Sequence, residues 1–316
     1  MESKIKIAPV LFFKRTNPPV FIISAIIMLV FILAVTLFTE VSKIFFDSIQ
    51  LIIIEKFSWI FTVSTVLFLV LVMFLLLSRF GSIRLSSTNE EPEFGYVTWF
   101  AMMFSAGMGI GLVFWSIAEP IKHFIKPPLI EPGTITPVDQ AISITFFHWG
   151  FHAWAIYVMV GLCLAYFSFR KGLPLTIRSC FYPLLGNKIY GGWGHCIDIF
   201  AVVGTMFGVA TSLGLGAMQI NSGLNFIGDC PETKLTQIAL IALITLFATV
   251  SVVLGLKKGV SRLSYFNVMM SVILLAFVFI LGPTLFIVNT FGEGIKNYLS
   301  NIIYFSYWSE WVATTE

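Results

Sequence analysis

Residues 144–157 contain three aromatic side chains of the kind that bind organic cations: Trp149, Trp154 and Tyr157. An aromatic face attracts a cation within about 6 Å, by up to roughly 2 kcal/mol when desolvated, and cages of such rings recognise quaternary ammonium groups. At about 100° per residue on a helix, Trp154 and Tyr157 share a face, whereas Trp149 lies about 140° from Trp154. A local turn or a neighbouring helix is therefore needed to gather all three rings around one ligand.

Less specific interpretations of this segment stay open. Trp and Tyr collect at membrane–water interfaces, so the three rings are also typical of an interfacial aromatic belt. His148 and His152 stand four residues apart, a spacing that can hold zinc. Because no third ligand is evident nearby in the sequence, we expect hydrogen-bonded packing histidines and neither a bound metal nor a cofactor.

The apolar segment 102–120 carries glycines at every second position, Gly107, Gly109 and Gly111. Each glycine in a helix interior costs roughly 1 kcal/mol relative to alanine. In lipid the freed backbone groups must be satisfied by protein, water, an ion or a ligand, so the segment suggests a discontinuous helix lining a site at mid-membrane depth. Gly107 and Gly111 also form a G-x-x-x-G pattern typical of close helix packing, and that alternative stays open. No strand precedes the glycines, which argues against a nucleotide-binding loop.

A second glycine-rich segment, residues 204–221, contains the hydroxyl groups of Thr205, Thr211 and Ser212. Hydroxyls and freed carbonyls are the ligands that a hard cation such as sodium prefers, because oxygen dipoles replace its water shell. Close helix packing, with each hydroxyl bonded back to its own helix, explains the same pattern. The spacing alone does not distinguish an ion site from packing.

These segments belong to a chain with the composition of a membrane protein. Of its 316 residues, 58% are hydrophobic and 11% are charged, about half the charged share of a soluble domain, and the mean hydropathy is +0.93. The sequence predicts an all-α polytopic membrane protein and gives no support for nucleic-acid binding. Glu119 and Asp198 lie near the ends of apolar runs. We interpret them as interfacial or gate residues and expect no enzyme activity, because no catalytic pair is evident.

Seven apolar runs are long enough to cross a bilayer, which takes about 20 helical residues. The third contains the glycines, and the fourth is longer than one crossing needs and is expected to be tilted. After Thr290 the mixed polar and aromatic sequence suits a helix that lies in the interface. The predicted spans are Pro19–Phe38, Phe57–Leu77, Tyr96–Ala118, Gln140–Phe169, Ile197 to about Ile220, Leu235–Leu256 and Tyr265–Val288.

The basic residues indicate the orientation of these spans. If the N-terminus is cytoplasmic, 13 of the 19 Lys and Arg residues fall in cytoplasmic segments, so the positive-inside rule places the N-terminus inside and the C-terminus outside. Seven spans in this orientation are the reverse of a G-protein-coupled receptor, which argues against that class. The inside segment 168–194 carries Arg170, Lys171 and Arg178, which we expect to face lipid headgroups.

Four segments of the chain resemble one known family. They are GMGIGLVFWSIAEP (107–120), FHWGFHAWAIY (147–157), FRKGLPLTIRSCFYPLLG (169–186) and GVATSLGLGAMQIN (208–221). Together they resemble the betaine/choline/carnitine transporter family, closer to its choline and glycine-betaine members than to carnitine exchangers. The similarity runs from about residue 10 to the end, and the combination of the four motifs is highly specific.

The resemblance implies a twelve-span transporter in which two peripheral helices precede two inverted five-helix repeats. On this pattern residues 1–90 hold a cytoplasmic N-terminus and two peripheral helices, residues 91–290 form the first five-helix repeat, and residues 291–316 begin an interfacial helix. The chain ends at Glu316, where the eighth span is expected. We therefore expect an incomplete chain that is inactive alone, because such folds alternate access by moving one repeat against the other.

The resemblance also implies the residues of a substrate site. An unwound helix is expected beside the substrate, with aromatic side chains of the next span as one wall of an aromatic box. The residues implied for these two parts are Gly107, Gly109 and Gly111, and Trp149, Trp154 and Tyr157.

The resemblance implies only some of the residues of the family's ion sites. Carbonyls near Ser105 and Met108 are expected to contribute to a sodium site, and Thr205 matches a hydroxyl that some members use for a second ion. Val209 stands one turn later, where those members have another hydroxyl. Sodium coupling and proton coupling therefore both stay open.

The implied function is symport of a trimethylammonium solute such as choline or glycine betaine, which serves osmoprotection or choline uptake. The expected location is the plasma membrane, here a bacterial inner membrane, with the N-terminus in the cytoplasm. The expected partners are the solute, membrane lipids and further copies of the chain in a homo-oligomer, a trimer by the resemblance. A channel or structural membrane protein that uses its glycines only for helix packing is the alternative.

Overall fold

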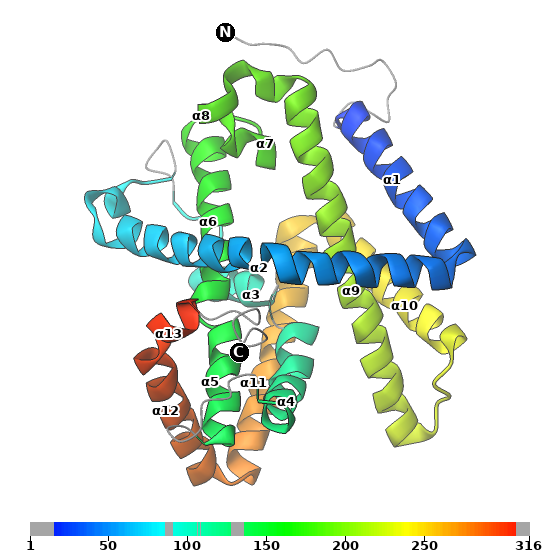
Figure 1. Cartoon of the computed structure of the whole chain (residues 1–316), viewed down its shortest axis with the longest axis vertical. Coiled ribbons are helices and arrows are strands. Elements are labelled where there is room, and N and C mark those ends of the chain that lie inside the picture. The colour runs from blue at the N-terminus through cyan, green and yellow to red at the C-terminus, as the bar shows by residue number, and fades with distance from the viewer. Residues whose placement is uncertain (1–15, 86–90, 106, 108, 128–135, 308–316) are drawn as a thin grey trace. The chain divides into compact units, whose positions relative to one another are not determined.

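The described part of the chain is built from helices (Figure 1). The structure is a computed structural model, and no strand occurs among the residues that it describes. The described residues are 16–85, 91–105, 107, 109–127 and 136–307.

The chain divides into two compact units. The first comprises Met1–Asn89 and Ala155–Gly208, and the second comprises Glu90–Trp154 and Val209–Glu316. The boundaries between the units fall within two helices, α6 and α9. A division by contacts does not reveal internal repeats, so the predicted division into a peripheral pair of helices, a five-helix repeat and an interfacial segment stays a prediction.

The first unit begins with α1 and α2, which are separated only by Phe38 and contact each other. Pro18 and Pro19 open α1, a position where the missing N–H of proline has no cost. The elements of this unit are α1 (Pro18–Leu37), α2 (Thr39–Leu77), η2 (Arg79–Ser82), the later part of α6 (Phe151–Ala165), η3 (Tyr166–Arg170), α7 (Ile177–Cys180), α8 (Tyr182–Leu185), η4 (Gly186–Tyr190) and the first part of α9 (Gly192–Gly228).

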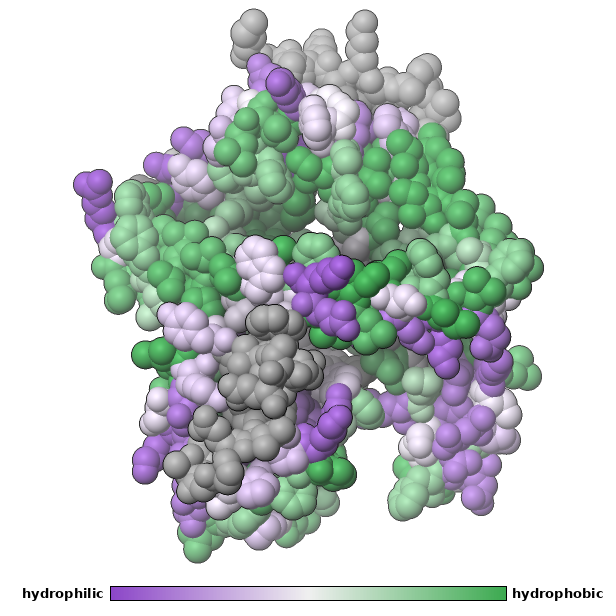
Figure 2. Space-filling model, viewed as in Figure 1, coloured by the Kyte–Doolittle hydropathy of each residue, from purple (hydrophilic) through white to green (hydrophobic). Residues whose placement is uncertain are grey.

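Helix α2 is longer than the sequence predicts. The second span was expected to begin at Phe57, but α2 runs without interruption from Thr39 over 39 residues. Residues 39–56 contain neither glycine nor proline, so nothing ends the helix there. At 1.5 Å per residue α2 is about 58 Å long, roughly twice the thickness of the hydrocarbon core. Apolar side chains cover much of its surface and that of α1 (Figure 2).

A buried ion pair joins α7 to α9 in the first unit. Arg178 Nε lies 2.9 Å from Asp198 Oδ2, and both side chains are less than one-tenth exposed. The backbone N–H of Arg178 also donates to Asp198 Oδ1 at 3.2 Å. The expectation that Arg178 faces lipid headgroups is therefore wrong, because a carboxylate as buried as Asp198 requires a charged partner. Arg178 is that partner, and the two side chains form a structural pair.

In the second unit, α5 contacts both α4 and α12, while α3 packs along α11 (Figure 1). The elements of this unit are α3 (Tyr96–Ser105), α4 (Ile110–Ile125), α5 (Pro137–Trp149), the start of α6, the later part of α9, α10 (Lys234–Val253), η5 (Leu256–Val260), α11 (Ser261–Leu281), α12 (Thr284–Ser300) and α13 (Ile302–Tyr307).

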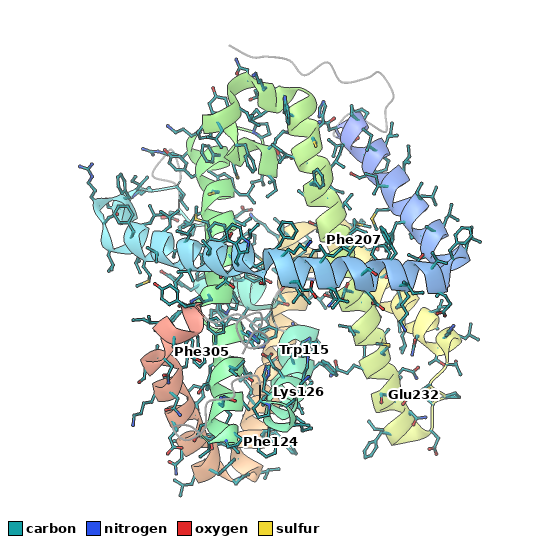
Figure 3. All side chains as sticks on the ribbon, in the orientation of Figure 1. Trp115, Phe124, Lys126, Phe207, Glu232 and Phe305 are labelled. Atoms are coloured by element: carbon teal, nitrogen blue, oxygen red, sulfur yellow. The ribbon has the colours of Figure 1, made fainter. Side chains whose placement is uncertain are left out.

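The buried apolar cluster of the second unit lies where α5 meets α12 and α13. It consists of Ile144 from α5, Tyr298 from α12 and Phe305 from α13. Of these three residues, Figure 3 labels Phe305. The partly buried side chains packed against it are Phe146, Phe147 and Ile302. This cluster packs α5 against α12 and α13, and α5 ends at Trp149.

Six helical segments among the described residues are long and apolar enough to cross a membrane. This finding confirms the prediction of an all-α polytopic membrane protein. The predicted third span is absent from the six because it is divided into α3 and α4, of 10 and 16 residues. Neither piece alone reaches the roughly 20 residues that a crossing needs.

The predicted seventh span extends too far toward the C-terminus. It was expected to end at Val288, but α11 ends at Leu281 and α12 begins at Thr284. Gly282 and Pro283 separate the two helices. Proline cannot continue α11 because it lacks the backbone N–H that the next helical hydrogen bond needs. The predicted interfacial helix therefore begins inside α12. Its place in the membrane stays a prediction, and residues 308–316 lie outside the described part.

Asp198→Ala tests the importance of the buried ion pair. The substitution leaves the Arg178 charge buried without a partner, which costs about 3–5 kcal/mol, so the variant should unfold at a clearly lower temperature. Lys257→Ala is the matched control, because Lys257 Nζ and Glu93 Oε1 form a 3.1 Å pair that is about two-thirds exposed and contributes less than about 1 kcal/mol. Thermal unfolding of both variants in detergent, followed by tryptophan fluorescence, provides the measurement. Equal melting temperatures would contradict the prediction.

Candidate functional site

The apolar segment with three glycines forms a broken helix. α3 ends at Ser105 and α4 begins at Ile110, with Gly107 and Gly109 in turn conformation between them. The predicted interruption is therefore confirmed. Gly111 differs from its two neighbours because it lies within the first turn of α4.

A second break divides the predicted fourth span at Gly150. α5 ends at Trp149 and α6 begins at Phe151, and Gly150 adopts φ −91° and ψ −146°. The freed N–H of Phe151 donates to the hydroxyl of Tyr298 at 3.0 Å. A methyl group at Gly150 would lie 2.7 Å from that hydroxyl, so this approach requires glycine. The break is the local turn between Trp149 and Trp154 that their spacing requires.

Two tryptophan rings lie against the glycines of the broken helix. A methyl group at Gly107 would lie 3.6 Å from Cη2 of Trp154, an ordinary van der Waals distance. A methyl group at Gly111 would lie 2.9 Å from Cη2 of Trp149, which is too close for a real contact. Among the described atoms, nothing lies within 4 Å of such a group at Gly109. The structure therefore brings four of the six predicted substrate-site residues together.

Trp154 continues a stack of aromatic rings on α3. Its ring is nearly parallel to that of Phe104, with centroids 6.3 Å apart, and Phe104 stacks on Phe100 at 4.9 Å. The sequence analysis missed both phenylalanines, although their spacing of four residues places them on one face of a helix. Tyr157 belongs to the first compact unit, and its side chain is 70% exposed.

The carboxylate of Glu119 orients the indole of Trp149. Trp149 Nε1 donates to Glu119 Oε2 at 2.7 Å, and Nδ1 of His148 bonds to Glu119 Oε1. His123 Nε2 lies 3.4 Å from the same oxygen. Glu119 is only 7% exposed. Its interpretation as an interfacial or gate residue thus misses its local role, which is to position a tryptophan.

His148 and His152 do not act as a pair. Nδ1 of His148 bonds to Glu119, whereas Nε2 of His152 lies 2.9 Å from the hydroxyl of Ser306 on α13. The expectation of hydrogen-bonded packing histidines is confirmed for His152. The sequence could not show that Glu119 and His123 would approach His148.

The residues expected near ions are divided between the two units. In the second unit, Ser105 Oγ accepts a hydrogen bond of 2.9 Å from the side-chain amide of Asn267 on α11. In the first unit, Thr205 donates to the carbonyl of Ala201 on its own helix at 2.7 Å. Met108 lies outside the described residues. Asn267 is absent from the sequence-based predictions. Its polar side chain within the apolar run of α11 is a signal that could have indicated it.

Comparison with known proteins identifies the family. The family model described as betaine/carnitine/choline family transporter matches residues 19–316. This chain belongs to the betaine/carnitine/choline transporter family. Its members are transporters and not enzymes.

Several relatives are 40% or more identical to this family member over the aligned residues. A glycine betaine transporter of Acinetobacter baylyi is 43% identical over 92% of the chain and 44% of the relative. The glycine betaine transporter OpuD of Bacillus subtilis is 46% identical over 83% of the chain and 51% of the relative. The high-affinity choline transport protein of Escherichia coli is 40% identical over 92% of the chain and 43% of the relative. The chain therefore spans about half the length of these transporters.

In this member of the family, Gly111→Ala should displace the indole of Trp149. The added methyl would lie 2.9 Å from the ring, so the ring must rotate away, whereas the methyl of Gly109→Ala would have no described atom within 4 Å. Fluorine NMR of fluorotryptophan-labelled protein, with the Trp149 signal assigned through Trp149→Phe, should show that signal shifted in Gly111→Ala and unchanged in Gly109→Ala. A Trp149 signal that stays in place in Gly111→Ala would show that the ring does not rest on this glycine.

Tyr298→Phe should destabilise the break at Gly150. The substitution leaves the N–H of Phe151 without its hydrogen-bond acceptor, and a buried unsatisfied group costs about 1–3 kcal/mol. Tyr265→Phe is the control, because it removes a phenolic hydroxyl from an exposed position of α11. The melting temperature in detergent should fall for Tyr298→Phe only. Equal effects of the two substitutions would overturn this assignment.

Proposed function

We propose that this chain carries the aromatic wall of the substrate site in a secondary transporter for quaternary ammonium solutes, with choline or glycine betaine as the substrate. The observation that supports this most directly is the placement of Trp149 and Trp154 against Gly111 and Gly107 of a broken helix. The names of the relatives add independent support, because they refer to glycine betaine and choline.

The proposed recognition depends on ring faces instead of an ion pair. A trimethylammonium group carries its charge without any hydrogen-bond donor, and desolvated aromatic faces attract such a group by up to roughly 2 kcal/mol each. Glu119 is the acid nearest in sequence to this site, but its two oxygens face Trp149 Nε1 and His148 Nδ1. We therefore assign the binding of the cation to Trp149, Trp154 and Tyr157, and the orientation of the first ring to Glu119.

We propose that sodium or protons drive the uptake. The candidate sodium ligands lie near Ser105 and Met108, and Thr205 is the candidate for a second ion. The hydrogen bond between Ser105 and Asn267 supports the first site, because it places polar groups of two helices at the point where α3 ends. Val209 stands where members with a second sodium site have a hydroxyl, so the proton stays an alternative coupling ion.

The proposed setting is a bacterial inner membrane with the N-terminus in the cytoplasm, as the distribution of Lys and Arg indicates. Membrane lipids are the surrounding partners, and a homo-oligomer, a trimer by family resemblance, is the proposed assembly. The apolar surface of α1 and α2 suits contact with lipid or with another copy of the chain.

One observation favours a second candidate function. Gly111 is close enough to Trp149 that packing alone explains why a side chain is absent there. A channel or structural membrane protein would use the same contact without binding any solute.

Binding of radiolabelled choline and glycine betaine to membranes that contain the chain distinguishes the two functions. Trp154→Ala should weaken binding about tenfold or more, because the loss of one cation–π contact removes up to roughly 2 kcal/mol and 1.4 kcal/mol corresponds to tenfold. Trp193→Ala is the matched control, since it removes a tryptophan that is 66% exposed near the start of α9, and it should bind like the parent chain.

An uncharged analogue of choline, in which carbon replaces the nitrogen, tests whether the charge is recognised. It should compete at least about tenfold more weakly than choline, because it keeps the shape but loses the attraction to the ring faces. Equal competition by the two compounds, or unchanged binding in Trp154→Ala, would contradict the proposed site and favour glycines that serve only for packing.

A further inference from the structure

A carboxylate and two imidazoles meet where α4 packs against α5. Glu119 and His123 stand four residues apart, on one face of α4, and His148 lies at the end of α5. One ligand atom from each of the three side chains lies within 4.8 Å of the other two. Figure 3 labels Phe124, the residue that follows His123 on α4.

The hydrogen bonds among these groups leave one nitrogen unused. His123 Nε2 is buried and makes no hydrogen bond within the described residues, although it lies 3.4 Å from Glu119 Oε1. The same oxygen already bonds to His148 Nδ1. A buried polar atom without a partner is costly. A cation among the three atoms would satisfy the carboxylate and both rings together.

We propose that Glu119, His123 and His148 form a binding site for a divalent transition-metal ion, with zinc as the expected occupant. Imidazole nitrogen and carboxylate oxygen are both zinc ligands, at about 2.0–2.2 Å, and tetrahedral geometry then separates the ligand atoms by about 3.4 Å. The separation of 3.4 Å between His123 Nε2 and Glu119 Oε1 already has this value. Three protein ligands leave the fourth position for water.

The surroundings of these side chains support a metal site. Glu119 Oε2 accepts a hydrogen bond from Trp149 Nε1 at 2.7 Å, and such outer hydrogen bonds orient the ligands of metal sites. Glu119 and His123 are 9% and 14% exposed at their side chains, whereas His148 is 43% exposed, which gives an ion a route of entry. The bound ion would join α4 to α5 and hold the carboxylate that positions Trp149.

Cobalt substitution tests the proposed site by spectroscopy, without any transport assay. The full chain, purified in detergent with a tag that contains no histidine, should bind one Co²⁺ with the visible absorption of a tetrahedral site and release it to Zn²⁺. His123→Ala should weaken cobalt binding at least about 100-fold, because the loss of an outer-shell partner alone costs 10–100-fold. His195→Ala is the matched control, since His195 bonds to Asn17 in the first unit, and it should bind cobalt like the parent chain.

His123→Cys keeps the test decisive if the alanine variant folds poorly. A thiolate is also a ligand for this class of ion, so His123→Cys should retain cobalt and add a near-ultraviolet charge-transfer band. Three results would overturn the proposal: no cobalt spectrum in the parent chain, equal loss of binding in His123→Ala and His195→Ala, or a folded His123→Cys variant without the charge-transfer band.

Discussion

The close contact between indole rings and glycines is the constraint on which the candidate site depends. A side chain at Gly111 would occupy the volume of the Trp149 ring, and Gly107 lies in contact distance of Trp154. Glycine therefore has two roles in one short segment. Gly111 lets α4 approach a ring, while Gly107 and Gly109 interrupt the helix. Close packing and an unwound helix, which the sequence presents as alternatives, occur together.

Broken helices in an apolar chain need partners for their freed backbone groups. At Gly150 the partner of the Phe151 N–H is the hydroxyl of Tyr298, a buried residue of α12. The helix predicted to lie in the interface thus contributes a specific hydrogen bond next to the two tryptophans. On the other side of α5, Glu119 bonds to the indole of Trp149. The backbone break between the two tryptophans is thus held by α12, and the indole of Trp149 is held by α4.

The differences between prediction and structure have local physical causes. Helix α2 begins before the predicted second span because residues 39–56 contain no helix breaker. The predicted last span ends early because Gly282 and Pro283 stop α11. Arg178 lies inside because a buried carboxylate, Asp198, requires its charge. In the first two cases the signal was present in the sequence, whereas the third depended on a residue 20 positions away.

The sequence by itself determined that the chain is helical and that it belongs in a membrane. It also suggested a helix break near Gly107 and Gly109 and placed tryptophans in the next span. These features depend on composition and on neighbours along the chain, which a sequence displays directly. Only the tertiary structure decided which ring lies on which glycine, that Asn267 reaches Ser105, and that Glu119 meets His148 from 29 residues away. Such contacts depend on how separate helices pack in space, and spacing along one helix does not contain that information.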